Sequence, residues 1–215
     1  MIDFALLGEL LPLFGEAALR TIALVAAAMA GGLALGFAMN AARETGLRAL
    51  VGLYWAYTTV WRGVPFLVHL FIVYFGLPSA GMRLDPFDAA ALTLAVYSGA
   101  YFAEIFRACW QRIPRGQIEA ARCMGLTRRQ VFWHIACPQA LRASLPLVAN
   151  QTILVMKESA LASVITYPEL TMTAGKVVSE QFVYVEPYVL LALSYWALAV
   201  LINRLGGWLR RYAAL

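Results

Sequence analysis

The sequence is poor in charged residues. Only 13% of its 215 residues are Asp, Glu, Lys or Arg, whereas 62% are hydrophobic. Soluble globular domains usually contain about 25% charged and about 45–50% apolar residues. A water-facing core of this length cannot bury so large an apolar excess, so a soluble enzyme, a disordered chain and a disulfide-stapled secreted domain are all disfavoured. The composition indicates a protein whose solvent is the lipid bilayer.

Other absences exclude further classes. The three cysteines form no Cys-x-x-Cys pair, so we expect them to be reduced, small hydrophobic residues and not a metal or redox site. The sequence has no Gly-x-x-x-x-Gly-Lys-Ser/Thr segment to hold phosphates, so we do not expect this chain to hydrolyse ATP itself. No Lys or Arg precedes Arg20, which argues against a cleaved signal peptide. No repeat or linker is visible, which predicts one domain over residues 1–215.

Long stretches of the chain carry no charge at all. A helix that crosses the hydrocarbon core needs about 20 mostly apolar residues. The uncharged stretch between Arg20 and Arg43 has 22 residues, and the one between Arg48 and Arg83 is interrupted only by Arg62. Shorter stretches follow further along the chain. We predict an all-α, polytopic membrane protein with about five spans, near residues 18–41, 53–77, 87–108, 141–166 and 187–207.

The positive charges gather on one side of these spans. The loop at 42–49, the segment at 107–142 and the C-terminal tail together hold 12 of the 17 Lys and Arg residues, Arg210 and Arg211 among them. Short loops rich in Lys and Arg stay in the cytoplasm. We therefore expect the N-terminus outside and the C-terminus inside. The net charge of +5 reflects this bias and does not indicate nucleic-acid binding.

The cytoplasmic segment at 112–138 has clear helix signals. Residues 117–124 suit a short helix, and Gly125 suits the left-handed position that ends one. Thr127 followed by Gln130 fits a capping box that starts a second helix, which is expected to stop before Pro138. Ala120 and Ala121 are expected to expose a shallow face.

The spacing alone leaves three interpretations of this helix–turn–helix. It suits an interfacial amphipathic loop or a docking element for a cytoplasmic partner. A DNA-reading helix–turn–helix is disfavoured because membrane spans flank the segment on both sides.

The residues of this segment resemble a known signature. Glu119-Ala120-Ala121 is followed after three residues by Gly125, and later by Ile135 and Cys137-Pro138. This pattern resembles the EAA motif of ABC importer permeases, except that the motif ends in Leu-Pro. Arg62-Gly63-Val64-Pro65 is similar to the Arg-Gly-Thr-Pro segment of the polar amino acid subfamily. The resemblance covers roughly residues 15–210, and its family is the histidine/glutamine/arginine-type permease subunit of ABC importers.

The resemblance implies a type I importer fold, a mechanism and a set of partners. The EAA loop would form a coupling helix that docks on a separate ATPase subunit, present in two copies, with Glu119, Ala120, Ala121 and Gly125 carried over to that role. ATP and Mg²⁺ would bind that partner, and no cofactor is expected on this chain. A second permease subunit, identical or homologous, and a periplasmic or surface solute-binding protein complete the expected importer. It would work by alternating access in the bacterial cytoplasmic (inner) membrane.

A few polar residues lie inside the predicted spans. An ionisable group at membrane depth costs at least about 2.5–3.5 kcal/mol, so it normally faces a cavity or a partner. Arg62 comes just before Gly63 and Pro65, where we expect a kink or a break in the helix. We expect Arg62 and Glu158 to face the substrate pathway, with hydrogen bonds from His69 and Ser159. The alternative is an internal Arg–Glu or Lys–Glu pair that only fixes helix packing.

The third span also carries a pair of charges near its inner end. Glu104 and Arg107 are three residues apart, where an ion pair on one helix face is expected.

Two rival functions remain at this point. A membrane-embedded lipid-modifying enzyme needs a cluster of acids or histidines on the cytoplasmic rim. The acids and the histidine predicted there are scattered along the sequence, so we expect no catalytic residues. A passive channel needs no coupling helix. Loss of a co-purifying ATPase on substitution of Gly125 or Glu119 would argue against both rivals.

Overall fold

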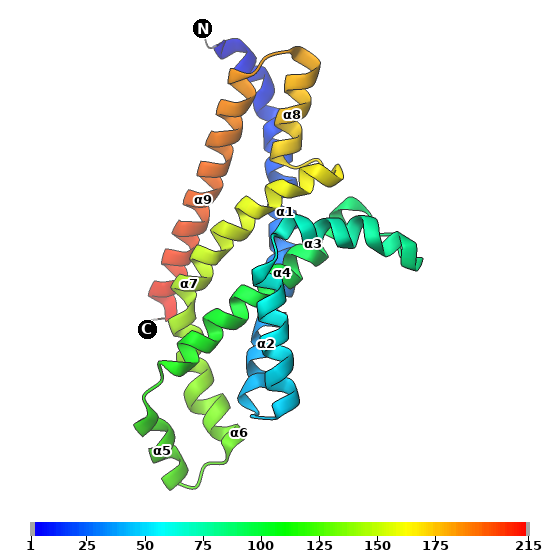
Figure 1. Ribbon diagram of the computed structural model, residues 1–215. Coiled ribbons are helices and arrows are strands. Elements are labelled where there is room, and N and C mark those ends of the chain that lie inside the picture. Colours follow the sequence, from blue (N-terminus) through cyan, green and yellow to red (C-terminus); the bar gives the residue numbers. More distant parts are fainter. Residues whose placement is uncertain (1–2, 214–215) are drawn as a thin grey trace.

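The computed structural model describes residues 3–213, and the side chains of residues 3–209. The side chains of Arg210 and Arg211, which entered the charge count above, lie outside this description. The described chain is built from α-helices joined by short turns, with two π-helical and two 3₁₀ segments and no strand (Figure 1). The predicted all-α class is confirmed.

The first helix, α1, is much longer than its predicted span. It runs over Phe4–Glu44, 41 residues, and the side chain of Asp3 caps its start by accepting from the backbone N–H groups of Ala5 and Leu6. Its N-terminal part packs through Leu10, Phe14 and Ala17 against α8 (Leu170–Gln181) and α9 (Val185–Ala213). The helix therefore continues well beyond the apolar stretch that predicted a span at 18–41.

The middle of α1 lies directly against α4 (Pro86–Gln111). A Cβ atom added to Gly32 would lie 2.3 Å from the Ser98 Oγ, and one added to Gly36 would lie 2.9 Å from the Gly99 carbonyl oxygen. Small residues let membrane helices approach to backbone contact. Gly32 and Gly36 thus let α1 pack closely against α4.

The second predicted span is sharply bent. The helix α2 (Arg48–Gly63) ends where Val64 takes an extended conformation, as the residue before a proline tends to do. The chain resumes in α3 (Phe66–Phe71), the π-helical segment η1 (Ile72–Gly76) and the 3₁₀ segment η2 (Leu77–Ala80), at 103° to α2. Figure 1 shows this part projecting sideways. The break expected at Gly63 and Pro65 is therefore confirmed.

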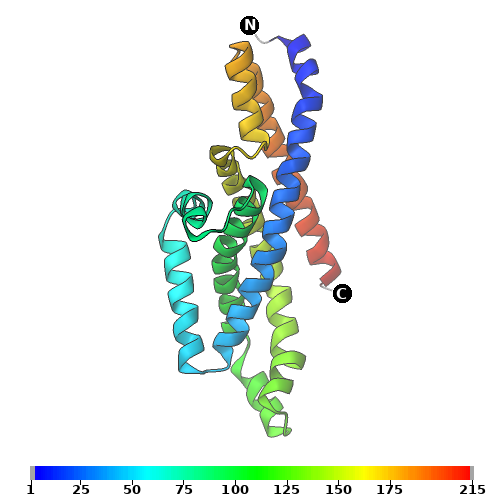
Figure 2. The same ribbon diagram turned by 90° about the vertical axis from the view of Figure 1, so that its right-hand side faces the viewer.

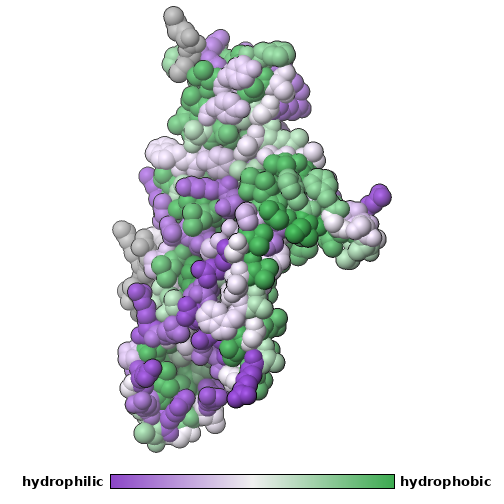
Figure 3. Space-filling view, in the orientation of Figure 1, coloured by the Kyte–Doolittle hydropathy of each residue, from purple (hydrophilic) through white to green (hydrophobic). Residues whose placement is uncertain are grey.

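Figure 3 shows how apolar this projection is. Its surface is mostly hydrophobic, whereas hydrophilic residues gather at the lower end of the same view, over α5 and α6. Val68, Ile72 and Phe75 are among its exposed apolar side chains. The projection is thus suited to lipid or to a neighbouring protein surface.

The segment at 112–138 folds as a helical hairpin. It contains α5 (Arg115–Cys123) and α6 (Arg128–Gln130), and it continues through the π-helical segment η3 (Val131–Ala136) into α7 (Cys137–Glu158). The prediction that the second helix stops before Pro138 is wrong. Pro138 stands in the first turn of α7, directly after the π-helical turns, whose wider spacing leaves room for a residue without an N–H.

The last third of the chain returns past the first helices. The 3₁₀ segment η4 (Ser159–Ile165) leads to α8, which Glu169 caps by accepting from the N–H groups of Thr171 and Met172. The stretch 167–187 between the last two predicted spans is therefore partly helical. The backbone N–H of Leu170 also donates to the Thr21 hydroxyl at 3.3 Å, which fixes α8 against α1.

Within the described residues, three helices are long and apolar enough to cross a membrane: α1, α4 and α9 over Val185–Leu209. The bent pair of α2 with α3 to Ala80 makes a fourth if it counts as one span. The helix α7 does not meet this test, so the number of five spans stays a prediction. Figures 1 and 2 place the 42–49 loop and the α5–α6 hairpin at one end of the molecule, with α8 and the start of α1 at the other. Which end faces the cytoplasm stays a prediction too.

Candidate functional site: a coupling hairpin and a polar cluster around α4

The turn of the hairpin is built as the sequence indicates. The helix α5 ends at Cys123, and Gly125 takes the left-handed conformation, with φ +83°. The side chain of Thr127 accepts from the N–H of Gln130 and the Gln130 side chain accepts from the N–H of Thr127, which completes the capping box. Positive φ strains any residue with a Cβ, so Gly125 is required by the backbone.

The residues assigned to coupling do not all face outward. Glu119, Ala120 and Gly125 are exposed. Ala121 is only 4% exposed, and its carbonyl accepts from the N–H of Leu126 at 3.1 Å. The expectation that both alanines expose a shallow face is therefore wrong for Ala121, which lies on the inner side of α5.

The hairpin is attached to the helices that flank it. The Gln139 side-chain N–H donates to the Gln117 side-chain oxygen at 2.8 Å, which joins α7 to α5. A small apolar cluster of Cys109, Ile113, Ala136 and Ala140, with Ile118 packed against it, joins the end of α4 to η3 and α7. A displacement of α5 would therefore act directly on α4 and α7.

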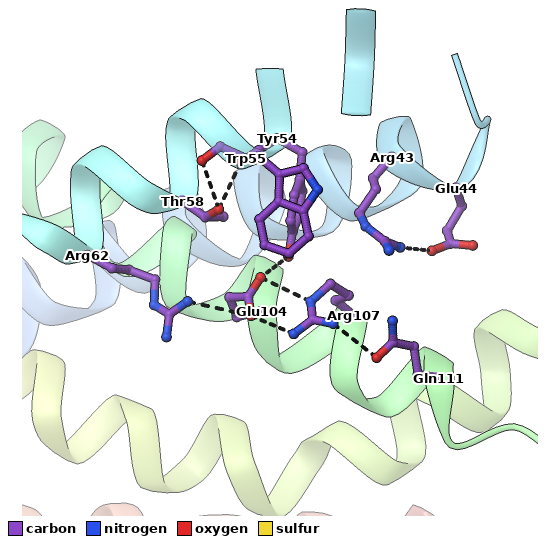
Figure 4. Close-up of polar contacts among 9 residues, drawn as sticks. All are labelled: Arg43, Glu44, Tyr54, Trp55, Thr58, Arg62, Glu104, Arg107 and Gln111. Atoms are coloured by element: carbon purple, nitrogen blue, oxygen red, sulfur yellow. Dashed lines mark hydrogen bonds and ion pairs between the residues drawn. The ribbon is translucent and has the colours of Figure 1, made fainter. Parts of the chain in front are cut away.

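A second polar feature lies between α2 and α4, and Glu104 is its centre (Figure 4). The Glu104 carboxylate accepts from Arg107 at 2.8 and 3.1 Å, which is the expected i,i+3 pair, and also from the Tyr54 hydroxyl of α2. Arg107 also donates to the Gln111 side chain at 3.0 Å. Glu104 is thus fully satisfied by Arg107 and Tyr54.

Arg62 joins this cluster from the end of α2, but loosely. Its guanidinium lies 3.5 Å from the Glu104 carboxylate and 5.4 Å from the centre of the Tyr101 ring. Its side chain is 41% exposed, and Figure 4 shows it on the side of Glu104 opposite Arg107. The structure therefore places Arg62 in an internal ion pair, with Glu104 as the partner.

The other polar residues of the predicted pathway approach the same face of α4. Tyr97 and Tyr101 of α4 are hydrogen-bonded to each other at 3.2 Å. The half-buried carboxylate of Glu158, at the end of α7, has only a weak electrostatic effect on the Tyr97 hydroxyl. Among the described residues, Glu158 forms no ion pair with Arg62 or with the exposed Lys157.

His69 and Ser159 are both buried. His69 is 6% exposed, stacks on Trp61 with ring centres 4.2 Å apart, and has an Nδ1 atom without a hydrogen-bond partner in the described chain. Its ring centre lies 6.3 Å from that of Tyr97. The Ser159 hydroxyl donates to the Met156 carbonyl, so its proton is used within its own helix.

Two of the four predicted pathway residues thus lie beside two tyrosines that the sequence reasoning missed. Arg62 lies over Tyr101 and His69 lies beside Tyr97, while Glu158 has only a weak electrostatic effect on Tyr97. The spacing of Tyr97, Tyr101 and Glu104 puts all three on one face of α4. That spacing was visible in the sequence, but only the fold shows which neighbours meet this face.

Comparison with known proteins decides the family. Residues 32–213 match the family described as "Binding-protein-dependent transport system inner membrane component". The chain belongs to this family. Its membership confirms the resemblance noted from the EAA motif, and the protein is a membrane-embedded permease.

Individual members of this permease family are similar over most of the chain. The probable glutamine ABC transporter permease protein GlnM of Bacillus subtilis (strain 168) is 38% identical over 80% of this chain and 80% of its own length. The arginine transport system permease protein ArtQ of the same organism is 32% identical over 95% of this chain and 94% of its own length.

A solved structure shows the same fold. It is described as the crystal structure of an amino acid ABC transporter with histidines, and it superposes with a TM-score of 0.91 at 33% identity over 99% of each chain. The predicted fold of a type I ABC importer permease is therefore confirmed.

Proposed function

We propose that this permease carries a polar amino acid, or a solute like one, across the bacterial cytoplasmic membrane by alternating access. The relatives described as glutamine and arginine permeases support this substrate class, as does the similar structure described with histidines. In this proposal the chain works with two copies of an ATPase subunit that bind ATP and Mg²⁺. A second permease subunit and an external solute-binding protein complete the importer. The chain itself needs no cofactor and no catalytic residue.

The observation that carries the substrate assignment is the placement of polar groups near Tyr97 and Tyr101. A zwitterionic amino acid needs a cation for its carboxylate and an anion for its ammonium group. Arg62 of α2 lies over Tyr101. Glu158 of α7 acts weakly on Tyr97 and does not neutralise Arg62. In the proposed site the Nδ1 of His69 and the hydroxyl oxygen of Ser159 add further polar contacts.

Arg62 is suited to bind and release a carboxylate. Glu104 keeps its bonds to Arg107 and Tyr54 when Arg62 moves away, so the move leaves no buried charge unpaired. The bend at Gly63 and Pro65 places Arg62 at a helix end, where loosened backbone groups are available to a ligand.

A transport measurement tests the pathway. Arg62→Gln and Glu158→Gln are reconstituted with the ATPase and the binding protein, and the uptake rate is measured across a range of substrate concentrations. We expect the substrate concentration for half-maximal uptake to rise about tenfold or more, because each variant removes one charged hydrogen bond of about 1.5–3 kcal/mol to the bound substrate. Arg83→Gln, which changes an exposed arginine outside the cluster, is the matched control. Unchanged rate and affinity in both variants would exclude the pathway role.

A binding measurement tests the coupling hairpin. Docking is proposed to use the exposed Glu119, Ala120 and Gly125, with the buried Ala121 holding the turn. Gly125→Ala strains the backbone at φ +83°, whereas Gly116→Ala on the same hairpin meets no atom within 4 Å of the added Cβ. We expect the ATPase to co-purify with Gly116→Ala but to be lost from Gly125→Ala and Glu119→Ala. Full retention by both of the latter would show that the hairpin does not couple.

A further inference from the structure

A pocket lies on the inner side of the hairpin, separate from the substrate cluster. It has a volume of about 410 Å³ and is enclosed by the last residues of α1, the end of α4, and the hairpin from Ile118 to Ala136. Because the ends of two long apolar helices form part of its wall, the pocket lies where those helices leave the apolar layer. It therefore occupies the level of a membrane surface.

The charge of the pocket is strongly positive. Arg122, Arg128 and Arg129 line it, and none of the three side chains forms an ion pair or a hydrogen bond within the described chain. Its one acid, Glu44, is already paired with Arg43 at 2.5 Å. Three guanidinium groups thus share one cavity without a counter-charge.

The rest of the lining is aromatic and aliphatic. Trp110, Phe132 and Trp133 form one wall, with the rings of Trp110 and Phe132 at 4.5 Å and those of Phe132 and Trp133 at 5.0 Å between centres. Tryptophan is enriched at the level of lipid headgroups, where its ring contacts apolar groups and its N–H remains near water. A cavity with guanidinium groups beside indole rings matches a ligand with a phosphate joined to an apolar chain.

We propose that this pocket binds the headgroup of an anionic phospholipid. Basic pockets between membrane helices at the cytoplasmic surface hold such headgroups. The phosphate lies among Arg122, Arg128 and Arg129, and the start of the acyl chains lies against Trp110 and Trp133. A bound lipid then joins the hairpin to the ends of α1 and α4.

The geometry favours a lipid over an acidic segment of the ATPase. Glu119, Ala120 and Gly125, the exposed residues of the hairpin, do not line the pocket. Only Ile118 and Arg122 of α5 do, and they lie one helical turn apart on its inner face. Ala120 lies on the side of α5 opposite Ile118 and Arg122, so this part of the exposed surface faces away from the pocket.

The experiment compares lipid selectivity among charge-matched variants. The full chain is purified in detergent, supplied with equal amounts of phosphatidylglycerol and phosphatidylcholine, and examined by native mass spectrometry. The pocket variant is Arg128→Gln/Arg129→Gln. The control is Arg115→Gln/Arg142→Gln, which removes the same charge from exposed positions that do not line the pocket.

We expect wild type and control to bind more phosphatidylglycerol than phosphatidylcholine. In the pocket variant, the ratio of bound phosphatidylglycerol to bound phosphatidylcholine should be roughly tenfold lower. An equal preference in all three proteins, or an equal loss in pocket variant and control, overturns the proposal. Thermal unfolding checks that each variant is folded, and Arg122→Gln replaces the double variant if it is not.

Two further measurements distinguish a bound lipid from two other occupants of the pocket, free phosphate and the ATPase subunit. Displacement of phosphatidylglycerol from wild type by millimolar inorganic phosphate would assign the pocket to free phosphate and overturn the lipid. Unchanged lipid preference in the pocket variant, with loss of the co-purifying ATPase, would assign the three arginines to the partner subunit. The proposal is supported if wild type retains phosphatidylglycerol in millimolar phosphate and the pocket variant still co-purifies with the ATPase.

Discussion

The two faces of α4 meet their neighbours by opposite means. Against α1, the contact is made by Gly32, Gly36 and Gly99, and a Cβ added to Gly36 would lie only 2.9 Å from the Gly99 carbonyl oxygen. Against α2, the contact is made by the ion pairs and hydrogen bonds of Glu104, with Arg62 at the exposed edge.

This difference separates a fixed interface from an adjustable one. Backbone contact between glycines has one geometry, because a small shift produces a clash or a gap. Long charged side chains keep their contacts over a range of helix positions, since their rotamers follow the partner. We therefore expect α1 and α4 to move as one body, and α2 to shift relative to them during transport.

The largest expected effect comes from breaking the fixed interface. Gly36→Leu puts a side chain against the Gly99 carbonyl and the Phe102 Cβ, neither of which can move freely. We expect a loss of about 3 kcal/mol or more in the free energy of unfolding. The measurement is the amount of folded protein recovered from membranes, followed by thermal unfolding. Gly15→Leu on the same helix meets nothing within 4 Å and is the control. Equal recovery of both variants would show that the interface is not tight.

An intermediate effect is expected at the centre of the adjustable interface. Glu104→Gln removes the charge that Arg107 and Arg62 share, and it weakens the hydrogen bond from Tyr54. We expect a loss of about 1.5–3 kcal/mol, the usual contribution of hydrogen bonds to charged groups. Denaturant titration in detergent checks this value, and a loss as large as that of Gly36→Leu would contradict the distinction between the two faces.

The smallest effect on stability is expected at the edge of the same cluster. Arg62→Gln removes a partly exposed ion pair while Glu104 keeps its bonds to Arg107 and Tyr54. Exposed ion pairs contribute about 0–1 kcal/mol, so we expect the free energy of unfolding to fall by less than about 1 kcal/mol. The same titration serves here. A loss equal to that of Glu104→Gln would mean that Arg62 is a structural residue and not a movable one.

Much of the fold follows from local signals in the sequence. The capping box at Thr127, the left-handed Gly125 and the bend before Pro65 each depend on the chemistry of a few neighbouring residues, and each lies where it is expected. The steep angle after Pro65 depends on packing against α4, which no local pattern contains. The continuation of the helix through Pro138 was missed because the rule for proline assumes α-helical spacing, and η3 departs from it.

The residues of the candidate site likewise include some that the sequence indicates and some that only the fold reveals. The charged residues in the spans were found because charge is rare in such a sequence. Their neighbours Tyr54, Tyr97 and Tyr101 were missed because aromatic residues are common in membrane helices and carry no signal by themselves. Long-range contacts, such as the hydrogen bond from Tyr54 to Glu104, exist only in the folded chain.

The unusual length of α1 has a mechanical consequence. At 1.5 Å per residue its 41 residues extend about 60 Å, twice the thickness of the hydrocarbon core. One end packs with α8 and α9, and the other borders the pocket beside the hairpin. A tilt of about 5° around its middle would displace each end by about 2.6 Å in opposite directions, by the geometry of a rod of that length. If α1 tilts as a rigid rod, a movement of its end at one surface of the membrane is accompanied by an opposite movement at the other surface, without any change in the conformation of the helix.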